Sequence, residues 1–244
     1  MNRPASCTRI KPFMETFGID PNEFRKTPDQ FNHFNEFFAR ELKAEARPID
    51  SSARSAVFPA DGRHLGFQNL SEVRSVFVKG QTFNLPALLQ DPELAKRYAR
   101  GTAVVSRLCP TDYHRFHFAL SGHPGKPRLI AGPLYSVNPL ALRRNLSFLW
   151  QNRRMITNLS SPDFGQVAII EFGATSVGSI RQTFQPEEAA AKGQEKGYFL
   201  FGGSATMTFF EPGKVDLAED LLANTKNQRE IYAQMGDVMA HLRS

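Results

Sequence analysis

The chain has 244 residues, of which 41% are hydrophobic and 22% are charged, with 17 Gly and 16 Pro. These values fit one large globular domain or two small ones, and they exclude a collagen-like or disordered chain. The 30 Lys and Arg residues outnumber the 24 Asp and Glu residues, and the excess is concentrated between Gly101 and Pro162, where eight basic residues accompany one acidic residue, Asp112. Such a segment indicates an anionic partner (a nucleic acid, a membrane surface or an acidic substrate) or, alternatively, a solvated basic face.

The two cysteines, Cys7 and Cys109, have no metal-type spacing and are too few for a disulfide framework, which favours a reducing compartment. No apolar run reaches the roughly 18 residues that span a bilayer. The first residues, MNRPASCTRI, lack the apolar core of a signal peptide. These features predict a soluble or peripheral protein.

In chain order, the first predicted element is an amphipathic helix from Pro28 to Lys43, because apolar residues recur there at helical spacing. Further helices are predicted over 85–98, from Pro139, and over 216–234. Between them, turn residues separate short runs of β character. These predicted strands lie at 74–79, 102–108, 115–120, 127–136, 153–159, 165–172 and 198–210. Helices towards both ends of a chain of many short strands predict a single α+β domain over 1–244 with a mainly antiparallel β core.

Most generic catalytic motifs are missing from the sequence. It has no phosphate-binding loop ending in Lys-Ser/Thr, no GxGxxG, no GxSxG and no HExxH. The sequence therefore does not favour nucleotide hydrolysis, dinucleotide binding or the commonest kinds of serine hydrolase as its function.

Two segments could carry chemistry through aspartate and histidine. PADGR (59–63) is typical of a turn whose Asp bonds its own backbone. CPTDYHRFHFALSG (109–122) holds His114 and His117, with His123 just beyond, which concentrates a residue that exchanges protons near neutral pH. The H-x-x-H spacing allows a metal site, but no carboxylate or cysteine cluster accompanies it, and positions i and i+3 of a strand face opposite ways. Structural histidines are the alternative.

A third segment, KGYFLFGGSATMTFFEPG (196–213), places Gly202, Gly203 and Ser204 between two aromatic β runs. A glycine pair within a strand usually marks a bulge. A serine beside such permissive residues can also be held in a strained conformation that favours attack on the preceding carbonyl.

Taken together, the segments resemble the phosphatidylserine decarboxylase family over nearly the whole chain. The similar segments, in the order of the family, are FNEFFARELKAEARPID, FPADGR, KGQTFNLPALL, RLCPTDYHRFH, LYSVNP, QNRRM, FGATSVGSI, FGGSA and MGD. No single segment would suffice, and the resemblance depends on their number and order.

The resemblance implies a proenzyme that cuts its own backbone between Gly203 and Ser204, giving associated chains 1–203 and 204–244. Ser204 would become a pyruvoyl group, the covalent cofactor of a decarboxylase that uses no metal. The resemblance further implies His117 as the base that activates Ser204, Asp61 as the residue that orients His117, and His114 as the group that returns a proton to the substrate or positions its carboxylate.

The implied reaction converts phosphatidylserine to phosphatidylethanolamine and carbon dioxide. The expected partners are this lipid and an anionic membrane surface on the cytoplasmic side, where the protein would be peripheral; a homodimer is left open, and nucleic acid is not expected. We expect Arg143, Arg144, Arg153 and Arg154, which flank Phe148-Leu149-Trp150, to belong to the docking face. Packing residues with solvated Arg ends are the alternative.

One position departs from the family pattern: Ala205 follows the processed serine where the family usually has Thr. Loss of a hydroxyl that could bind the intermediate predicts slowed or altered processing. Two other functions stay open at this point, a pyruvoyl-dependent decarboxylase of a free amino acid and a non-processing relative that only binds anionic lipid.

Overall fold

The computed structural model describes residues 1–73, 82–174, 179–202 and 204–243. The α-helices are α1 (Ile10–Phe17), α2 (Phe34–Phe38), α3 (Leu85–Leu89), α4 (Pro92–Tyr98), α5 (Pro139–Arg144), α6 (Phe148–Gln151) and α7 (Glu219–Lys226). Short 3-10 helices span Pro4–Arg9, Pro21–Glu23, Pro28–Gln30, Ala44–Ala46 and Leu70–Glu72. The strands are β1 (Ser55–Val57), β2 (Gly62–Phe67), β3 (Thr102–Leu108), β4 (Arg115–His117), β5 (His123–Pro124), β6 (Arg128–Ile130), β7 (Arg154–Ser161), β8 (Gly165–Gly173), β9 (Ile180–Gln182), β10 (Glu195–Phe199), β11 (Ser204–Phe210), β12 (Val215–Leu217), β13 (Ile231–Ala233) and β14 (Val238–Leu242).

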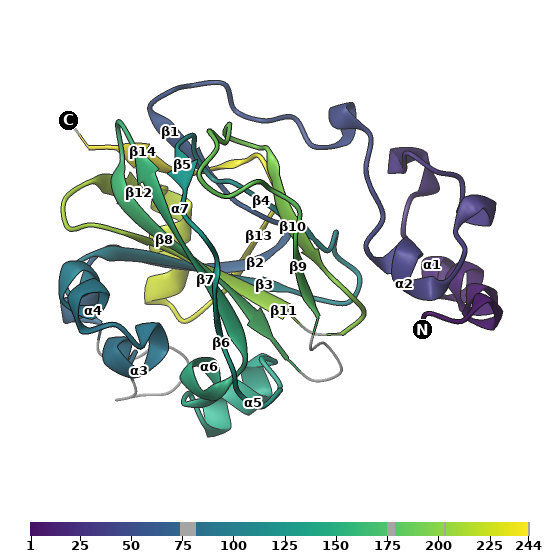
Figure 1. The fold of residues 1–244 in the computed structure, drawn as a ribbon, viewed down its shortest axis with the longest axis horizontal. Coiled ribbons are helices and arrows are strands. Elements are labelled where there is room, and N and C mark those ends of the chain that lie inside the picture. Colours follow the sequence, from purple (N-terminus) through teal and green to yellow (C-terminus); the bar gives the residue numbers. More distant parts are fainter. Residues whose placement is uncertain (74–81, 175–178, 203, 244) are drawn as a thin grey trace.

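The strands form one large sheet and two small ones (Figure 1). The large sheet has the order β13-β2-β3-β11-β8-β7, and both β5 and β6 pair with β7. The small sheets have the orders β1-β14-β12 and β4-β10-β9. All of these pairings are antiparallel, so the predicted α+β class with an antiparallel core is confirmed.

The large sheet is covered on both faces, and β11 lies near its middle. Successive side chains of a strand alternate between faces. Ala205, Met207 and Phe209 belong to an apolar cluster that includes residues of α3, α4, α5 and α6. Phe210 belongs to a second cluster with residues of β1, β12 and β14. Ser204 therefore shares the face that is turned away from α3 to α6.

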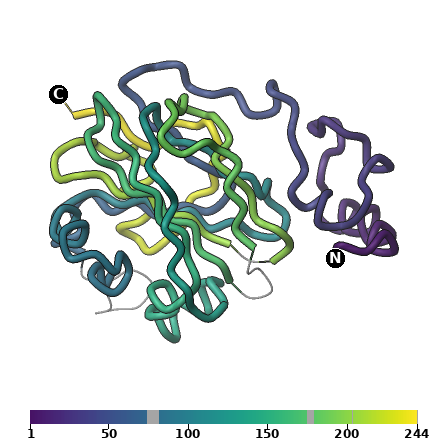
Figure 2. Tube along the Cα trace, in the orientation of Figure 1, coloured from purple at the N-terminus to yellow at the C-terminus, as the bar shows by residue number. Residues whose placement is uncertain are grey.

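The first residues form a lobe beside the sheets, and in Figures 1 and 2 this lobe lies at the opposite side of the molecule from the C-terminus. Its core is a cluster of six buried residues: Ile10, Phe24, Phe31, Phe34, Phe37 and Phe38. Ring pairs in this cluster meet largely edge to face, for example Phe31 and Phe37 at 5.7 Å. The aromatic stripe seen in the sequence is thus a core.

The predicted helix over 28–43 is shorter in the structure, where a 3-10 turn precedes α2 and the chain leaves the helix at Ala39. The predicted helix over 85–98 is divided, because Gln90 adopts a left-handed conformation and Asp91 then caps α4, in which Pro92 is the first residue. Side-chain caps and proline therefore set these boundaries in spite of the apolar periodicity.

The predicted strands over 102–108, 153–159 and 165–172 are confirmed as β3, β7 and β8, and those over 115–120 and 127–136 are confirmed in part as β4 and β6. The run over 198–210 is two strands, β10 and β11, and Gly202 between them has φ 142°, a value that favours glycine. The predicted helix over 216–234 contains α7 flanked by β12 and β13. The predicted strand over 74–79 lies outside the described residues.

A fully buried ion pair joins the large sheet to the small sheet that contains β4. Lys196 Nζ on β10 lies 2.8 Å from Glu171 Oε1 on β8, and neither side chain is exposed to solvent. Gln182 donates to Glu171 at 2.8 Å and accepts from Lys196 at 2.9 Å. Burial raises the pKa of Glu171 and lowers that of Lys196, and their attraction opposes both shifts.

We expect Glu171→Ala to lower the free energy of unfolding by about 3–5 kcal/mol, because it leaves a buried ammonium without its partner. The double variant Glu171→Leu/Lys196→Met removes both charges and should recover most of this loss. Urea denaturation measures both values. A double variant as unstable as the single one would show that packing, and not the unpaired charge, causes the loss.

Candidate active site

Ser204 is the first residue of β11, where it pairs with Leu108 of β3 on one side and Gly173 of β8 on the other. The serine is completely buried, and its Oγ has no hydrogen-bond partner among the described residues. A buried hydroxyl without a partner costs free energy, and such exceptions are few in native proteins. This serine therefore holds an unsatisfied and potentially nucleophilic oxygen. Gly203 itself lies outside the described residues.

His114 lies beside the segment that leads to Ser204. Its main-chain oxygen accepts a hydrogen bond from the Phe199 N–H at 2.9 Å, and its ring packs on Phe38 with centroids 3.9 Å apart. The Gly202 backbone lies close enough to the ring to raise its pKa. Nε2 is buried, and no described residue forms a hydrogen bond of standard geometry with it.

His117, at the end of β4, has different surroundings. Its Nδ1 lies 2.9 Å from the Gly193 oxygen, and its Nε2 lies 3.3 Å from the Tyr113 hydroxyl. Neither of these two contacts reaches the Gly202–Ser204 segment. The two histidines thus face different neighbours, in line with the alternation of side chains along a strand.

The contacts at Nδ1 decide which ring nitrogen carries the proton in the neutral histidines. A carbonyl oxygen can only accept, so His117 Nδ1 donates to Gly193, and His114 Nδ1 donates to the Asp112 oxygen at 2.9 Å. Both rings therefore present Nε2 as a lone pair. Burial lowers the pKa of His117, and it lowers the pKa of His114 to about 3. At neutral pH both groups are uncharged and able to accept a proton.

Asp61, which precedes β2, is bound by a different residue from the one expected. Arg47 donates to both carboxylate oxygens, through Nε at 3.0 and 2.9 Å and through Nη2 at 2.7 Å. The Met235 N–H adds a third donor at 2.9 Å. No hydrogen bond joins Asp61 to His117 in the described part of the chain, but the negative charge of Asp61 raises the pKa of His117.

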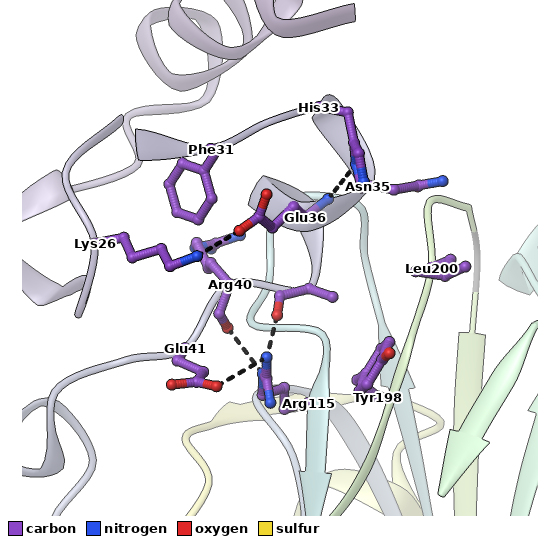
Figure 3. Close-up of a pocket in the computed structure, with 11 residues that line it drawn as sticks. Lys26, Phe31, His33, Asn35, Glu36, Arg40, Glu41, Arg115, Tyr198 and Leu200 are labelled. Atoms are coloured by element: carbon purple, nitrogen blue, oxygen red, sulfur yellow. Dashed lines mark hydrogen bonds and ion pairs between the residues drawn. The ribbon is translucent and has the colours of Figure 1, made fainter. Parts of the chain in front are cut away.

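Arg40 lies between two cavities beside these groups. One, of about 350 Å³, is also lined by Asp61 and Tyr113. The other, of about 250 Å³, lies between the N-terminal lobe and β10 (Figure 3). Arg40 is buried, its guanidinium lies over the rings of Phe24 and Phe37, and desolvation lowers its pKa to about 10.

Figure 3 shows the ion pairs and backbone contacts among the residues that line the second cavity. Lys26 pairs with Glu36 at 2.5 Å. Arg115 donates to the Ala39 oxygen at 2.9 Å and lies 3.5 Å from Glu41. The lobe is thus attached to β4 next to His114.

Sequence reasoning did not assign Arg40, Arg47 or the hydroxyl of Tyr113 to the site. The Arg residues belong to FFAR and ARPID, within the first segment that resembles the family, and Tyr113 directly precedes His114. Their types were visible, but no local pattern specifies their partners: Asp61 lies 14 positions from Arg47, and the Tyr113 hydroxyl contacts His117, four positions away.

No group of three or more His, Cys, Asp or Glu side chains suited to a metal ion is found among the described residues. Within the same ranges, no helix combines the length and the apolar character that a membrane span requires.

Comparison with known proteins gives a consistent match over most of the chain. The profile of the phosphatidylserine decarboxylase family matches residues 34–240. A phosphatidylserine decarboxylase proenzyme of Clostridium perfringens is 43% identical over 238 residues, covering 98% of this chain and 81% of the relative. The proenzyme of Chlamydia muridarum is 46% identical over 227 residues, covering 93% and 75%, and that of Fusobacterium nucleatum is 43% identical over 237 residues, covering 97% and 79%. These matches show that the chain belongs to the phosphatidylserine decarboxylase family.

Proposed function

We propose that this chain cuts itself before Ser204 and then decarboxylates phosphatidylserine to phosphatidylethanolamine. The observation that carries the proposal is the buried Ser204 Oγ without a hydrogen-bond partner, which follows two glycines and lies near a histidine whose Nε2 is also unpartnered. An apolar site without competing donors keeps such a hydroxyl available for attack.

The cleavage requires a base that removes the Ser204 proton. We assign this role to His117, whose neutral Nε2 offers a lone pair and whose ring is held by the Gly193 carbonyl. Ser204 Oγ attacks the Gly203 carbonyl carbon, and the C–N bond breaks to give an ester. Removal of the Ser204 α-proton then expels the Gly203 carboxylate, and water replaces the nitrogen of residue 204, which leaves as ammonia. His114 is the second candidate for the base, because the Gly202 backbone lies near its ring.

The pyruvoyl group that results at position 204 would accept the electron pair released when carbon dioxide leaves the substrate. We assign to His114 the return of a proton to the substrate α-carbon. The ring is neutral at rest, so it would relay a proton that Nε2 takes up from water, and burial, which lowers the pKa of His114 to about 3, makes the charged ring give up that proton readily.

The two chains produced by cleavage would stay together through the large sheet. β11 opens the chain 204–244 and pairs along its whole length with β3 and with β8, both of which belong to 1–203. In the same chain, β13 pairs with β2 and β14 pairs with β1. Cutting the bond before β11 leaves all of these ladders intact.

The position of Ala205 indicates how strongly the absence of a threonine hydroxyl there would affect processing. Its side chain is buried in the apolar cluster with α3 to α6, on the face of β11 opposite to Ser204. The side chain of a threonine at 205 would leave the strand on that same apolar face. This placement supports processing that is slowed or altered rather than lost.

Part of the expected docking face is supported, and one residue is corrected. Arg154 is fully buried and donates to the oxygens of Ala87, Leu88 and Asn152, so it cannot contact a membrane. Arg143, Arg144 and Arg153 are exposed. Arg153 lies near the Ser204 end of the sheet, because the Gly173 N–H donates to the Arg153 oxygen and Gly173 pairs with Ser204. Arg143 lines a cavity with Arg107, which pairs with Ala205, and the exposed Leu140 lies on the same helix, α5.

We therefore propose a peripheral protein that docks through this face on the cytoplasmic side, where its two free cysteines would stay reduced. The variant Arg143→Glu/Arg144→Glu/Arg153→Glu should bind anionic vesicles at least tenfold more weakly, at roughly 1 kcal/mol per lost charge, with an unchanged melting temperature. Sedimentation with vesicles measures the binding. Unchanged binding would remove this face from the proposal.

The function is tested by product analysis. The purified chain is incubated with vesicles that contain phosphatidylserine, with free serine as a competing substrate, and lipid and amine products are measured. Phosphatidylethanolamine without ethanolamine is the expected result. Ethanolamine alone would indicate a free amino acid decarboxylase, and binding to vesicles without cleavage or product would indicate a lipid-binding relative.

A further inference from the structure

A surface cavity lined by four arginines shares Arg63 with the cavity beside Asp61 and Tyr113, and its other lining residues are different ones. Its volume is about 420 Å³, and its lining residues are Arg63, Leu65, Arg107, Pro139, Arg143, Gln228, Arg229 and Glu230. They come from β2, β3, α5 and the segment between α7 and β13. Elements that are distant in sequence thus bring four guanidinium groups and a single carboxylate to one cavity.

Two of the arginines are direct neighbours across the sheet. Arg63 of β2 pairs with Arg107 of β3, an arrangement of like charges that is unfavourable by itself. Each has a partial compensation: Arg107 donates to Glu230 at 2.9 and 2.6 Å, and Arg63 uses Nη1 alone on Asp112, at 3.0 and 2.8 Å. Neither Nε nor Nη2 of Arg63 is bound to a described residue.

The other two arginines have no such compensation. Arg143 and Arg229 are exposed, and neither side chain forms an ion pair with any residue that the structure describes. Of the four guanidinium groups, only that of Arg107 is engaged by the one lining carboxylate. The cavity therefore has an excess of positive charge and free planar donors, which match a phosphate group.

The cavity is separate from Ser204. Arg107 pairs directly with Ala205, so its side chain shares the face of Ala205, opposite to the face of Ser204. A ligand in this cavity would lie on the other side of the sheet from the candidate nucleophile. It would bind as a second molecule, in addition to the substrate.

We propose that this cavity binds the phosphodiester of an anionic phospholipid headgroup. A lipid fits better than free phosphate because Arg143 also belongs to the exposed docking face and lies one turn of α5 from Leu140, which is 71% exposed. Basic and apolar groups on one helix can engage the headgroup and the acyl boundary together. The bound lipid would hold α5 against the membrane while the substrate uses the opposite face.

The test compares two variants that lose the same charge. Arg143→Gln/Arg229→Gln removes the two unpaired arginines of the cavity, and Lys96→Gln/Arg100→Gln removes two exposed cations of α4 and its end, away from the cavity. Binding is measured to vesicles of phosphatidylcholine with phosphatidylglycerol, which carries a phosphodiester but no amine or carboxylate. The result is therefore independent of decarboxylation.

We expect the cavity variant to bind roughly tenfold or more weakly and the control to bind almost as well as wild type. Glycerol phosphate should compete with the vesicles more strongly than sodium chloride at equal ionic strength, and only for proteins with an intact cavity. Equal losses in the two variants, or competition no stronger than that of chloride, would overturn a phosphate site. Glycerol phosphate that binds without vesicles as tightly as the lipid does would overturn the lipid as its ligand.

Discussion

Ser204→Ala should remain a single chain of 244 residues with no decarboxylase activity, whereas the wild type should give chains 1–203 and 204–244. Alanine has no oxygen to attack the preceding carbonyl, so neither the cleavage nor the pyruvoyl group can form. Intact mass spectrometry checks both points. The shorter wild-type chain should be lighter by one ammonia than a chain that begins with serine, and its N-terminus should resist Edman degradation.

The strand offers a matched control. Thr206 lies two residues further along β11 on the same face, and its Oγ1 is also buried, with no hydrogen-bond partner in the described part of the chain. Thr206→Val keeps the shape and removes the hydroxyl, so it should be cleaved like the wild type, with stability within about 1 kcal/mol of it. Cleavage of Ser204→Ala would disprove the assigned nucleophile. Loss of cleavage in Thr206→Val would show that the site depends on more than Ser204.

The two histidines should separate the two steps. His117→Ala should slow cleavage by roughly 10²–10⁴-fold, because the Ser204 proton then has no positioned acceptor. His114→Ala should still be cleaved and should lose a similar factor in decarboxylation by the mature enzyme. Mass analysis over time follows the first step, and phosphatidylethanolamine formation by cleaved protein follows the second.

His64 provides the control for removing a buried histidine. It is fully buried on β2, its ring contacts the Ser106 hydroxyl at 2.9 Å, and desolvation lowers its pKa to about 3. His64→Gln should lose stability without losing cleavage. If instead His114→Ala is the variant that fails to cleave, the base is His114, as its position near Gly202 allows.

The pH dependence of cleavage follows from the direction of the pKa shift. The active base is neutral, and burial lowers the pKa of His117 from its ordinary value of 6.5. At pH 6.5 more than half of the base should therefore still be neutral, and the rate should fall to half of its maximum only below pH 6.5, when the ring takes up a proton. A rate that halves at pH 6.5 would show that the base is solvated.

The site was predictable from sequence only in its residue types. Ser204, His114, His117 and Asp61 stand in segments whose order resembles one family, so they could be named without a structure. The partner of Asp61 could not be named, since the fold brings Arg47, 14 positions earlier and ahead of β1, to the carboxylate that precedes β2. Arg154 illustrates the same limit, because its place in a basic, aromatic stretch suggested a surface and the structure buries it under α3.

Local sequence patterns were sufficient to predict the α+β class and the positions of β3, β7, β8 and β11, and they identified the glycine pair before Ser204. Apolar periodicity and turn residues act between residues that are close in sequence, so a single sequence is enough to detect them. The unpartnered state of Ser204 Oγ, the buried pair of Glu171 and Lys196, and the cavity of four arginines were decided by packing. Each depends on which distant elements meet, and the free energy of a buried polar or charged group depends on the neighbours that the fold supplies.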